Sequence, residues 1–505
     1  MERGSDQRAI RRRSDRGALE SQEPSYPPDA GDCPDDEQHH GEEDQGTDPP
    51  VDGAGQWIRI GFFRPAHDQL RSTDLVEMKV GSLALNHVRD PLQEVEQLGI
   101  INGDSGLIHG FPTAVFDPHR RILPQVPADL SLLTEEQRSL ATMVREFASE
   151  VAAPASVDLE EQEEDPAALY RQLADLGLTG IAFPEEYGGG GQPYLTYLLV
   201  IEELARAYLG LAIGLSVHTL CAFATEHFGN DEQKNEVLAR LTSGEWFGAY
   251  SLSEPGSGSD AASLSTKAAA TAGGYRLSGS KVFCTRGAEA DVVLVMARTG
   301  GPGPEGISAF LVQNPTPGFS GTKKEDKMGW RSSPTWALAF DGAEVPTSRL
   351  LGEEGQGFKI ALASLDSGRL GIAACSIGLA QAALDATITF TGEREQFGQP
   401  VSAHEGVQFM LADMATHIEA GRRLYRYAAD LRDAGYDYSL QAAQAKLFCS
   451  DVAMRVTTDA VQLHGGYGYI KEYPVERYMR EAKGLQIVEG TNQIQRFVIG
   501  RKLAS

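Results

Sequence analysis

The sequence predicts an α+β chain of several domains: an α-helical N-terminal domain, a middle antiparallel β-barrel or sandwich, and a C-terminal domain like a four-helix bundle. Three observations support this order. Apolar residues recur at helical spacing from about residue 131, the period becomes extended near residue 248, and the helical period returns after residue 357 and continues to the end. We therefore expect domains over residues 131–248, 249–356 and 357–505.

Composition and charge narrow the class of protein. The 505 residues allow about two to four domains, and 41% hydrophobic residues can bury a sizeable core. A net charge of -26 disfavours nucleic acid and anionic membranes as partners, because their phosphates would be repelled. Five scattered cysteines without metal-ligand spacing fit reduced thiols and no metal site. We identify no apolar run of about 18 residues and no secretory signal, and we expect no membrane span and a cytoplasmic location.

Residues 1–55 have the composition of a disordered tail. A basic run at 11–13 alternates with acidic runs at 35–37 and 42–44, and few large apolar residues are available to offset the entropy of ordering. The interleaved acidic residues argue against a transit peptide. Residues 56–130 are an extension broken by several prolines, either a family-specific appendage or an over-extended gene start.

The first folded helix is expected to begin at a capping box formed by Thr134 and Gln137. Apolar residues then recur at helical spacing: Leu140, Met143, Val144, Phe147 and Val151. Further helices are expected over 169–176, 195–207, 211–227 and 233–241. The glycine run at 188–191 follows no strand, so we interpret it as a loop and not as a phosphate-binding turn. His218 and His227 lie among apolar helix residues, which favours core or surface positions over ligand roles.

Apolar residues recur with different periods in the middle and C-terminal regions. Short strands are expected over 275–277, 281–283, 292–296, 308–312 and 338–340, separated by Gly-rich turns. Long amphipathic runs over 358–392, 405–434 and 439–463 are typical of a helical bundle.

The stretch from Gln486 to Arg496 carries one carboxylate in a constrained place. An apolar approach leads to Glu489, Gly490 provides a hinge, and Thr491 can cap a final helix. A carboxylate delivered this way can act as a base. Alternatively, it is a solvated first-turn residue that the helix dipole favours.

This stretch resembles the segment Tyr-Glu-Gly-Thr-Ser-Gln-Ile-Gln-Arg of acyl-CoA dehydrogenases, in which the Glu removes the α-proton of the acyl thioester. Three upstream segments resemble the same family, so the resemblance covers about residues 131–505, and the family has the same order of helices, strands and helices. It implies FAD as cofactor, an acyl-CoA as substrate and Glu489 as catalytic base. It further implies Thr491 and Gln493 as cofactor contacts and Gly490 as a substrate contact.

The second segment, Tyr250 to Asp260, resembles the signature Ser/Thr-Glu-Pro-x-x-Gly-Ser-Asp, a loop that packs on the flavin. Its glycines allow close backbone approach. By resemblance, Ser253 is the hydroxyl at the pyrimidine edge, and Ser259 touches both cofactor and acyl-CoA. The expected cofactor contacts in this loop are Tyr250, Leu252, Ser253, Gly258 and Ser259.

The third segment, residues 283–287, resembles Trp/Phe-Ile-Thr-Asn-Gly. The resemblance implies that Phe283 covers one side of the isoalloxazine and that the Thr285 hydroxyl bonds near N5. Arg286 replaces the usual Asn, either as a charge beside the flavin or as a solvated arginine at the barrel edge.

The fourth segment, residues 462–469, resembles the family's second signature. Its paired glycines let the FAD of a neighbouring subunit lie against the backbone, and a guanidinium fork is well shaped to hold the pyrophosphate. The expected contacts are Arg394, Phe397, Gln462, Gly465 and Gly466. Glu405 stands where the family usually has Gln, which removes an amide donor near the cofactor's adenosine half.

Residues 365–369 bear on the identity of the base and on the substrate. In a minority of the family, including isovaleryl-type enzymes, the catalytic Glu stands where this chain has Gly368, which leaves Glu489 as the base. Asp366 and Arg369 match positions around the CoA portion and join Ser259 and Gly490 as expected substrate contacts. The sequence of this segment most resembles that of short-chain members and favours a short or branched acyl group in the substrate.

The resulting hypothesis is α,β-dehydrogenation of an acyl-CoA to the trans-2-enoyl-CoA, with the α-proton passing to Glu489 and the β-hydride to flavin N5. By resemblance, electron-transferring flavoprotein is the acceptor and a homotetramer the assembly. An acyl-CoA oxidase would keep Glu489 and use oxygen. A flavin monooxygenase or nitroalkane-oxidising relative would usually have a different residue at the position of the catalytic Glu. A non-catalytic scaffold would lose the flavin contacts.

Overall fold

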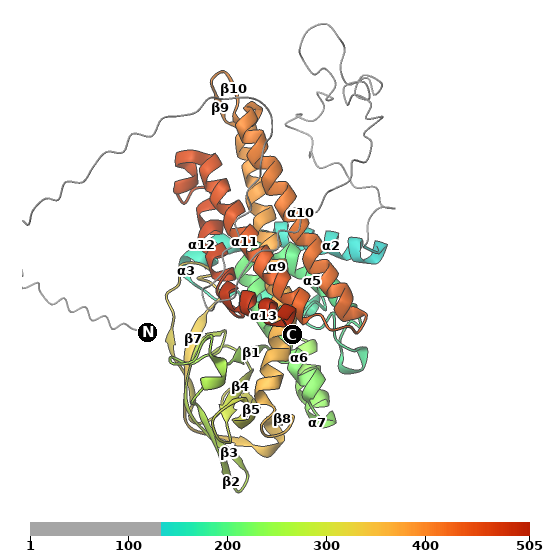
Figure 1. Ribbon diagram of the computed structural model, residues 1–505, viewed down its shortest axis with the longest axis vertical. Helices are drawn as coiled ribbons and strands as arrows, with labels where there is room; N and C mark the ends of the chain where they lie inside the picture. Colours follow the sequence, from blue (N-terminus) through green and yellow to red (C-terminus); the bar gives the residue numbers. More distant parts are fainter. Residues whose placement is uncertain (1–132, 505) are drawn as a thin grey trace, which may run out of the picture. The chain divides into compact units, whose positions relative to one another are not determined.

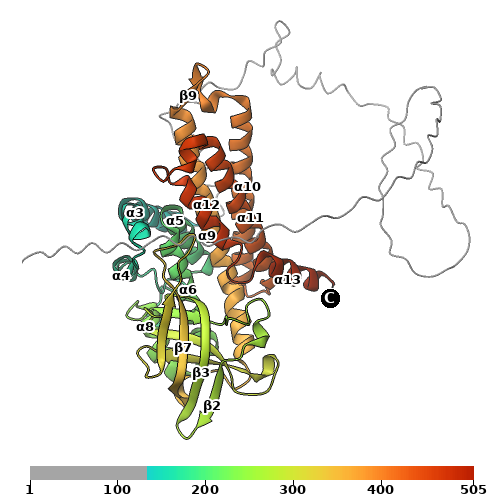
Figure 2. The ribbon, with the colours of Figure 1, turned by 90° about the vertical axis from the view of Figure 1, so that its left-hand side faces the viewer.

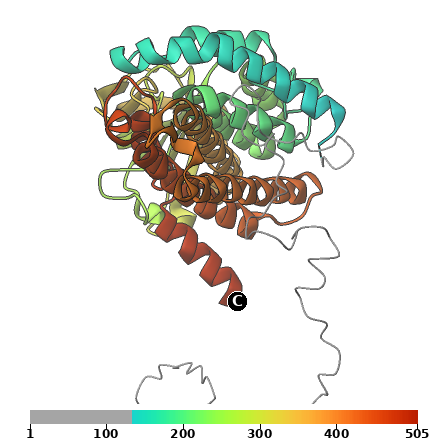
Figure 3. The ribbon, with the colours of Figure 1, turned by 90° about the horizontal axis from the view of Figure 1, so that it is seen from above.

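The computed structural model describes residues 133–504, and the expectations for residues 1–132 lie outside these described residues. Helices, a sheet and helices follow one another along the described chain, as the sequence predicts (Figure 1). The N-terminal helices lie on one side of the long C-terminal helices, and the final helix projects on the other (Figure 3).

The N-terminal helices begin at the predicted capping box. The Gln137 backbone N–H donates to Thr134 Oγ1, and the Thr134 N–H donates to Gln137 Oε1, each at 3.1 Å. The helices are α2 (Glu135–Phe147), α3 (Ala153–Gln162), α4 (Ala167–Asp175), α5 (Tyr194–Ala207), α6 (Leu209–Phe228) and the short α7 (Asp231–Gln233) and α8 (Ala239–Thr242). Val151 is 38% exposed, because the π-helical turn Ala148–Ala152 shifts the apolar face of the chain after α2.

The middle region is one open sheet and not a closed barrel. Its strands are β1 (Gly248–Ser251), β2 (Lys267–Thr271), β3 (Gly274–Thr285), β4 (Val292–Arg298), β5 (Ile307–Gln313), β6 (Phe319–Lys324), β7 (Thr335–Pro346) and β8 (Leu350–Leu351). They follow the order β6-β7-β3-β2-β4-β5-β8, with β1 beside β4. The predicted all-antiparallel pairing is wrong at two places, since β1 and β2 each pair with β4 in parallel.

The sheet is buried on both faces at β4. Val292, Leu294 and Met296 point to an apolar cluster shared with α6 and α9, while Val293 and Val295 point to a cluster shared with β3 and β7. The sheet therefore folds over on itself, as in a sandwich, although its edge strands do not meet.

The predicted strands at 275–277 and 281–283 form one long strand, β3. The pairing of β3 with β7 shifts register between Lys281 and Cys284, and within this bulge Phe283 has φ +58°. A bulge re-aims a side chain, and Phe283 is 69% exposed although it lies in the middle of a strand segment.

Three long helices form the C-terminal bundle (Figures 1 and 2). They are α9 (Gly357–Glu393), α10 (Glu405–Asp433) and α11 (Ser439–His464), and α9 packs against both of the others. A small ribbon of β9 (Glu395–Gln396) and β10 (Gln399–Pro400) follows α9, and the chain ends in α12 (Val475–Leu485) and α13 (Asn492–Ala504). Helix α9 also packs on β4 and β5 with its first turns, so one helix reaches from the sheet to the far end of the bundle.

Two of the described helices, Leu209–Phe228 and Gly357–Glu393, are long and apolar enough to cross a membrane. Most of each helix is buried within the fold, as is usual for core helices that pass the same test. The cysteines of the described part, Cys221, Cys284, Cys375 and Cys449, are buried and free.

Candidate active site

Glu489 lies in the connection between α12 and α13. Its backbone adopts φ +53° and that of Gly490 φ +90°, so two consecutive residues are left-handed. This conformation is unusual for a residue other than glycine. Thr491 then caps α13 as predicted, with its Oγ1 accepting from the Ile494 N–H at 3.3 Å. The turn aims the Glu489 side chain back toward α9.

The Glu489 carboxylate is shielded from water although part of the residue is exposed. Both carboxylate oxygens are buried, and neither has a hydrogen-bond partner among residues 133–504. Burial raises the pKa of this carboxyl to about 8, while the charges of Lys446 and Arg369 act in the opposite direction. The alternative interpretation of Glu489 as a solvated first-turn residue does not hold, because its carboxylate is buried.

Gly368 lies directly against this carboxylate. A methyl group added at Gly368 would lie 2.1 Å from Glu489 Oε2 and 2.6 Å from Leu220 Cδ2. Such distances exclude any side chain at this position without movement of the neighbours. The two positions at which the resemblance places a base are thus spatial neighbours.

Asp366 and Arg369, which lie about one turn apart on α9, form an ion pair. Arg369 is almost fully buried, and its Nε finds no hydrogen-bond partner within the described residues. Burial raises the pKa of Asp366, and the Arg369 charge lowers it. These two residues were predicted to contact the CoA portion of the substrate, and the structure places the Arg369 charge close enough to influence Glu489.

The predicted flavin loop lies on the sheet side of Glu489. The Tyr250 hydroxyl donates to the Ala361 carbonyl of α9 at 3.3 Å, and the charge of Glu489 together with burial raises the pKa of Tyr250. Leu252 is buried, and the Ser253 carbonyl accepts from the Val282 N–H at 2.9 Å. The loop and strand β3 are thereby joined. Ser253 and Thr285 are half-buried, and Gly258 and Ser259 are exposed.

A buried ion pair that sequence reasoning missed holds this loop. Lys281 Nζ donates to Glu254 Oε1 at 2.8 Å and to the Leu252 carbonyl at 3.0 Å, and Lys281 is excluded from solvent. Glu254 also accepts from the backbone N–H groups of Ser265 and Thr266. Each charge is thus fully compensated, which burial requires. The signal of this ion pair in the sequence was Lys281, a lysine two residues before the aromatic Phe283.

Arg286 is neither solvated nor turned toward the exposed surface. It is 5% exposed, forms an ion pair with Asp165, and its guanidinium lies 4.1 Å from the centre of the Tyr170 ring. A second ring, that of Phe247, lies 5.4 Å away. The prediction of a solvated arginine at the barrel edge is therefore wrong: Arg286 joins the sheet to the N-terminal helices.

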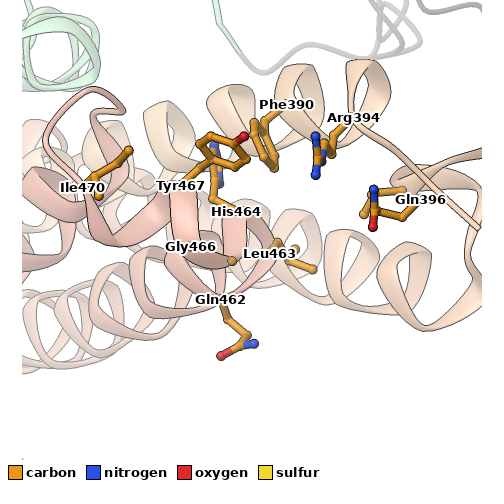
Figure 4. Close-up of a pocket in the computed structure, with 11 residues that line it drawn as sticks. Phe390, Arg394, Gln396, Gln462, Leu463, His464, Gly466, Tyr467 and Ile470 are labelled. Carbon is orange, nitrogen blue, oxygen red and sulfur yellow. The ribbon is translucent and has the colours of Figure 1, made fainter.

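A second group of predicted residues lies at the other end of α9. Arg394, Gln462, Gly465 and Gly466 line a surface cavity of about 430 Å³ at the ends of α9 and α11 (Figure 4). The Arg394 guanidinium lies 5.5 Å from the centre of the Tyr467 ring and forms no ion pair with a described residue. Phe397, in the ribbon after α9, is 96% exposed.

The two groups do not meet within one chain. Gly368 and Arg394 are about 26 residues apart along α9, which corresponds to roughly 39 Å at the α-helical rise. Gln493, predicted as a cofactor contact, is exposed on α13, and Thr491 is half-buried beside Glu489. A cofactor that contacts both groups must therefore do so with residues of two copies of the chain.

The residues present fit a large planar cofactor with a phosphate portion. Phe283 offers an exposed ring, and no atom of the described residues lies within 4 Å of a methyl group placed on Gly258, Gly465 or Gly466. The Arg394 guanidinium, which forms no ion pair with a described residue, is well shaped for a phosphate.

Family comparisons agree with this geometry. The acyl-CoA dehydrogenase N-terminal domain matches residues 134–245, the middle domain residues 249–343 and the C-terminal domain residues 355–504.

Similar proteins share nearly their whole length with this chain. An acyl-CoA dehydrogenase of Bacillus subtilis is 48% identical, over 74% of this chain and 98% of its own. Butyryl-CoA dehydrogenase from Megasphaera elsdenii is 44% identical over 74% of this chain and 99% of its own, with a TM-score of 0.73. A chain in a structure described as an electron transferring flavoprotein of Acidaminococcus fermentans is 48% identical over 74% and 98%, also with a TM-score of 0.73.

The order of domains, the buried carboxylate and these matches define an oxidoreductase. More narrowly, the chain belongs to the acyl-CoA dehydrogenase family, whose members depend on FAD.

Proposed function

We propose that this chain catalyses the α,β-dehydrogenation of an acyl-CoA with Glu489 as the base that removes the α-proton. The observation that carries the proposal is the environment of the Glu489 carboxylate, which is buried, has no hydrogen-bond partner in the described part of the chain, and is aimed at α9 from a left-handed turn. An unpartnered buried carboxylate is costly in a fold, and strained backbone concentrates at functional sites.

Burial makes this carboxylate a stronger base than one in water. With its pKa raised to about 8, Glu489 holds an abstracted proton more firmly than an ordinary carboxylate does, and an appreciable fraction is still ionised near neutral pH. The α-proton passes to a Glu489 oxygen, and the electron pair of that C–H bond remains to form the new double bond. Burial of both carboxylate oxygens against α9 at Gly368 keeps water from the carboxylate.

The cofactor would be held by two sets of residues. Tyr250, Ser253, Phe283 and Thr285 would hold its ring portion near Glu489, and Arg394 and the glycines at 465 and 466 of a second copy would hold its phosphate portion. FAD, when bound, supplies the acceptor for the β-hydride.

The preferred substrate proposed here is a short or branched acyl-CoA. The supporting observation is the 44% identity to a butyryl-CoA dehydrogenase. Asp366 and Arg369 would lie near the CoA portion, with Ser259 and Gly490 as further substrate contacts.

Electron-transferring flavoprotein is the proposed acceptor, because a chain 48% identical to this one occurs in a structure of such a flavoprotein. A homotetramer is the proposed assembly. The separation of the two cofactor-binding groups along α9 supports an assembly in which copies share their sites.

An anaerobic titration of the purified protein with butyryl-CoA tests the proposal. Bleaching of the oxidised flavin absorbance is expected in the wild type and not in Glu489→Gln. Flavin that stays oxidised with butyryl-CoA and with a panel of longer and branched thioesters would refute it. Peroxide release in air during turnover would favour an acyl-CoA oxidase instead.

A further inference from the structure

Lys446 is a charged residue on the buried face of α11. Its side chain is 0% exposed, and its Nζ donates to the Gly490 carbonyl at 3.0 Å and to Asn492 Oδ1 at 2.8 Å. Both acceptors belong to the turn that carries Glu489. A buried ammonium is costly unless it is well bonded, so its retention beside this turn calls for an explanation.

Asn492 is held in one orientation by its neighbours. Its Oδ1 accepts from Lys446 and from Ser450 Oγ, and its Nδ2 donates to Asp451 Oδ1 at 2.7 Å. Asp451 also accepts from Gln486 Nε2 at 2.7 Å, at the start of the same turn. An inverted amide would face Nδ2 toward an ammonium and Oδ1 toward a carboxylate, so only this orientation satisfies all partners.

The other side of the turn is held from α13. Gln495 Nε2 donates to the Glu489 carbonyl at 3.2 Å and to the Gly490 carbonyl at 2.8 Å. These bonds are made to the backbone of Glu489 and Gly490 and to Asn492, while neither Glu489 carboxylate oxygen has a hydrogen-bond partner among the described residues.

We infer that Lys446 is a positioning residue for Glu489: through Gly490 and Asn492 it fixes the left-handed turn, and its ammonium places a positive charge behind the base. The inference rests on the proposed role of Glu489 and extends it to a residue on a different helix. Lys446 touches neither carboxylate oxygen and acts through the turn and through its charge.

The charges that face this pair are few. Lys446 and Arg369 oppose the effect of burial on Glu489, and the Asp366 carboxylate neutralises much of the Arg369 charge. Tyr194 on α5, Tyr250 on β1 and Cys375 on α9 also face Glu489, and burial raises the pKa of each, which keeps them neutral. Asp451 faces Lys446 and supports its charge. Of these two cations Lys446 has the larger effect on Glu489, and because burial lowers the pKa of Lys446 to about 7, its positive charge declines above neutral pH.

The test compares four holoenzyme variants: Lys446→Met removes the charge and the bonds, Lys446→Arg keeps the charge, Asn492→Ala removes one acceptor, and Lys359→Met is a matched control at an exposed lysine of α9. The first readout is the rate of anaerobic flavin reduction by butyryl-CoA across about pH 6–9. In Lys446→Met we expect the apparent pKa of the base to rise by about one unit, a tenfold weaker acid. Lys446→Arg restores most of the profile, and Lys359→Met leaves it unchanged.

The second readout is hydrogen exchange of the segment 486–495 without substrate. Faster exchange is expected in Lys446→Met and in Asn492→Ala, and not in Lys359→Met, because the turn loses its bonds to α11. This measurement remains informative if the wild type reduces no flavin, an outcome that would refute the proposed function alone. A Lys446→Met rate that falls equally at every pH, or an unchanged exchange rate in both turn variants, would overturn the inference. Asn492→Ala keeps the exchange test available if Lys446→Met does not fold.

Discussion

The Cα of Gly368 packs directly against the Glu489 carboxylate. A methyl group added at Gly368 would lie only 2.1 Å from Glu489 Oε2, so the space between the two residues cannot hold one. The first residue is on α9 and the second follows α12, more than a hundred positions later in the chain. One side chain can fill this space, and in this protein it comes from Glu489.

Gly368→Ala should therefore push the carboxylate away from its position. We expect the rate of flavin reduction to fall about 100-fold, since a displacement of about 1 Å can have that effect. Gly392→Ala is the matched control, because it lies on the same helix with nothing within 4 Å of the added methyl group. Equal rates in the two variants would show that the contact does not position the base.

Glu489→Gln should make the fold more stable at alkaline pH. The Glu489 pKa is raised to about 8 in the folded chain, so the wild type gains from protonation below about pH 4.5 and loses that stability as the pH rises toward 8. The amide of the Glu489→Gln variant does not titrate, so the variant does not lose this stability as the pH rises. We expect the unfolding midpoint of the variant to exceed that of the wild type by an amount that grows with pH, equivalent to about 4 kcal/mol at pH 8. A constant difference across pH would contradict a raised pKa.

The rate of flavin reduction in the wild type should increase with pH. Only the ionised carboxylate accepts a proton, and burial places its pKa near 8, while burial lowers the pKa of Lys446 to about 7. Because the two groups interact, the profile reports apparent values for the pair. Single-turnover rates between about pH 6 and 9 check this, and a rate that is already maximal at pH 6 would refute it.

Arg286→Asn, which introduces the residue usual in the family segment, should lower stability. It leaves the Asp165 carboxylate without its partner and removes the cation from the Tyr170 ring. The expected cost is about 2–4 kcal/mol of unfolding free energy, measured as a lower thermal midpoint. The double variant Arg286→Asn with Asp165→Asn should recover part of it, and a double variant no more stable than Arg286→Asn would show that the ion pair is not the cause.

Arg394→Met should weaken FAD binding without changing the turn at Glu489. The guanidinium lines the far cavity and forms no ion pair with a described residue, so its loss disturbs no internal contact. We expect about 10-fold to 100-fold weaker retention of FAD during dialysis, as for the loss of one charge-assisted contact. Arg423→Met, on the surface of α10, serves as the control, and equal FAD content in both variants would count against a phosphate contact at Arg394.

Helical periodicity predicted the helices well because their contacts are largely local. The ends of α5, α6 and α9 lie within about two residues of the expected positions, a normal margin for helix ends. The sheet was harder to predict, because strand pairing is non-local. The alternation in β4 was visible, but nothing near it in the sequence indicates that β1 and β2 lie parallel to it. The alanine-rich strand β2 lacks large apolar residues and was not predicted.

The candidate base could be picked out only by resemblance, since a Glu before Gly-Thr is ordinary by itself. What distinguishes Glu489 is contributed by Gly368, Leu220 and Lys446, which are distant in sequence. The same holds for Arg286, whose partner Asp165 lies in the N-terminal region. Lys446 did leave a signal, because it falls in register with the buried residues Ala442, Ala443, Cys449 and Ala453 of α11.

The length of helix α9 sets the distance between the predicted site residues near Gly368 and those near Arg394. Each residue inserted between Gly368 and Arg394 would turn one end by about 100° relative to the other and lengthen the helix by about 1.5 Å. Insertion of seven residues would nearly restore the phase but lengthen the spacing by about 10 Å. Because the proposed cofactor would have to reach residues of two copies, we expect the length of α9 between these points to be far less free to vary than the surface loops at its two ends.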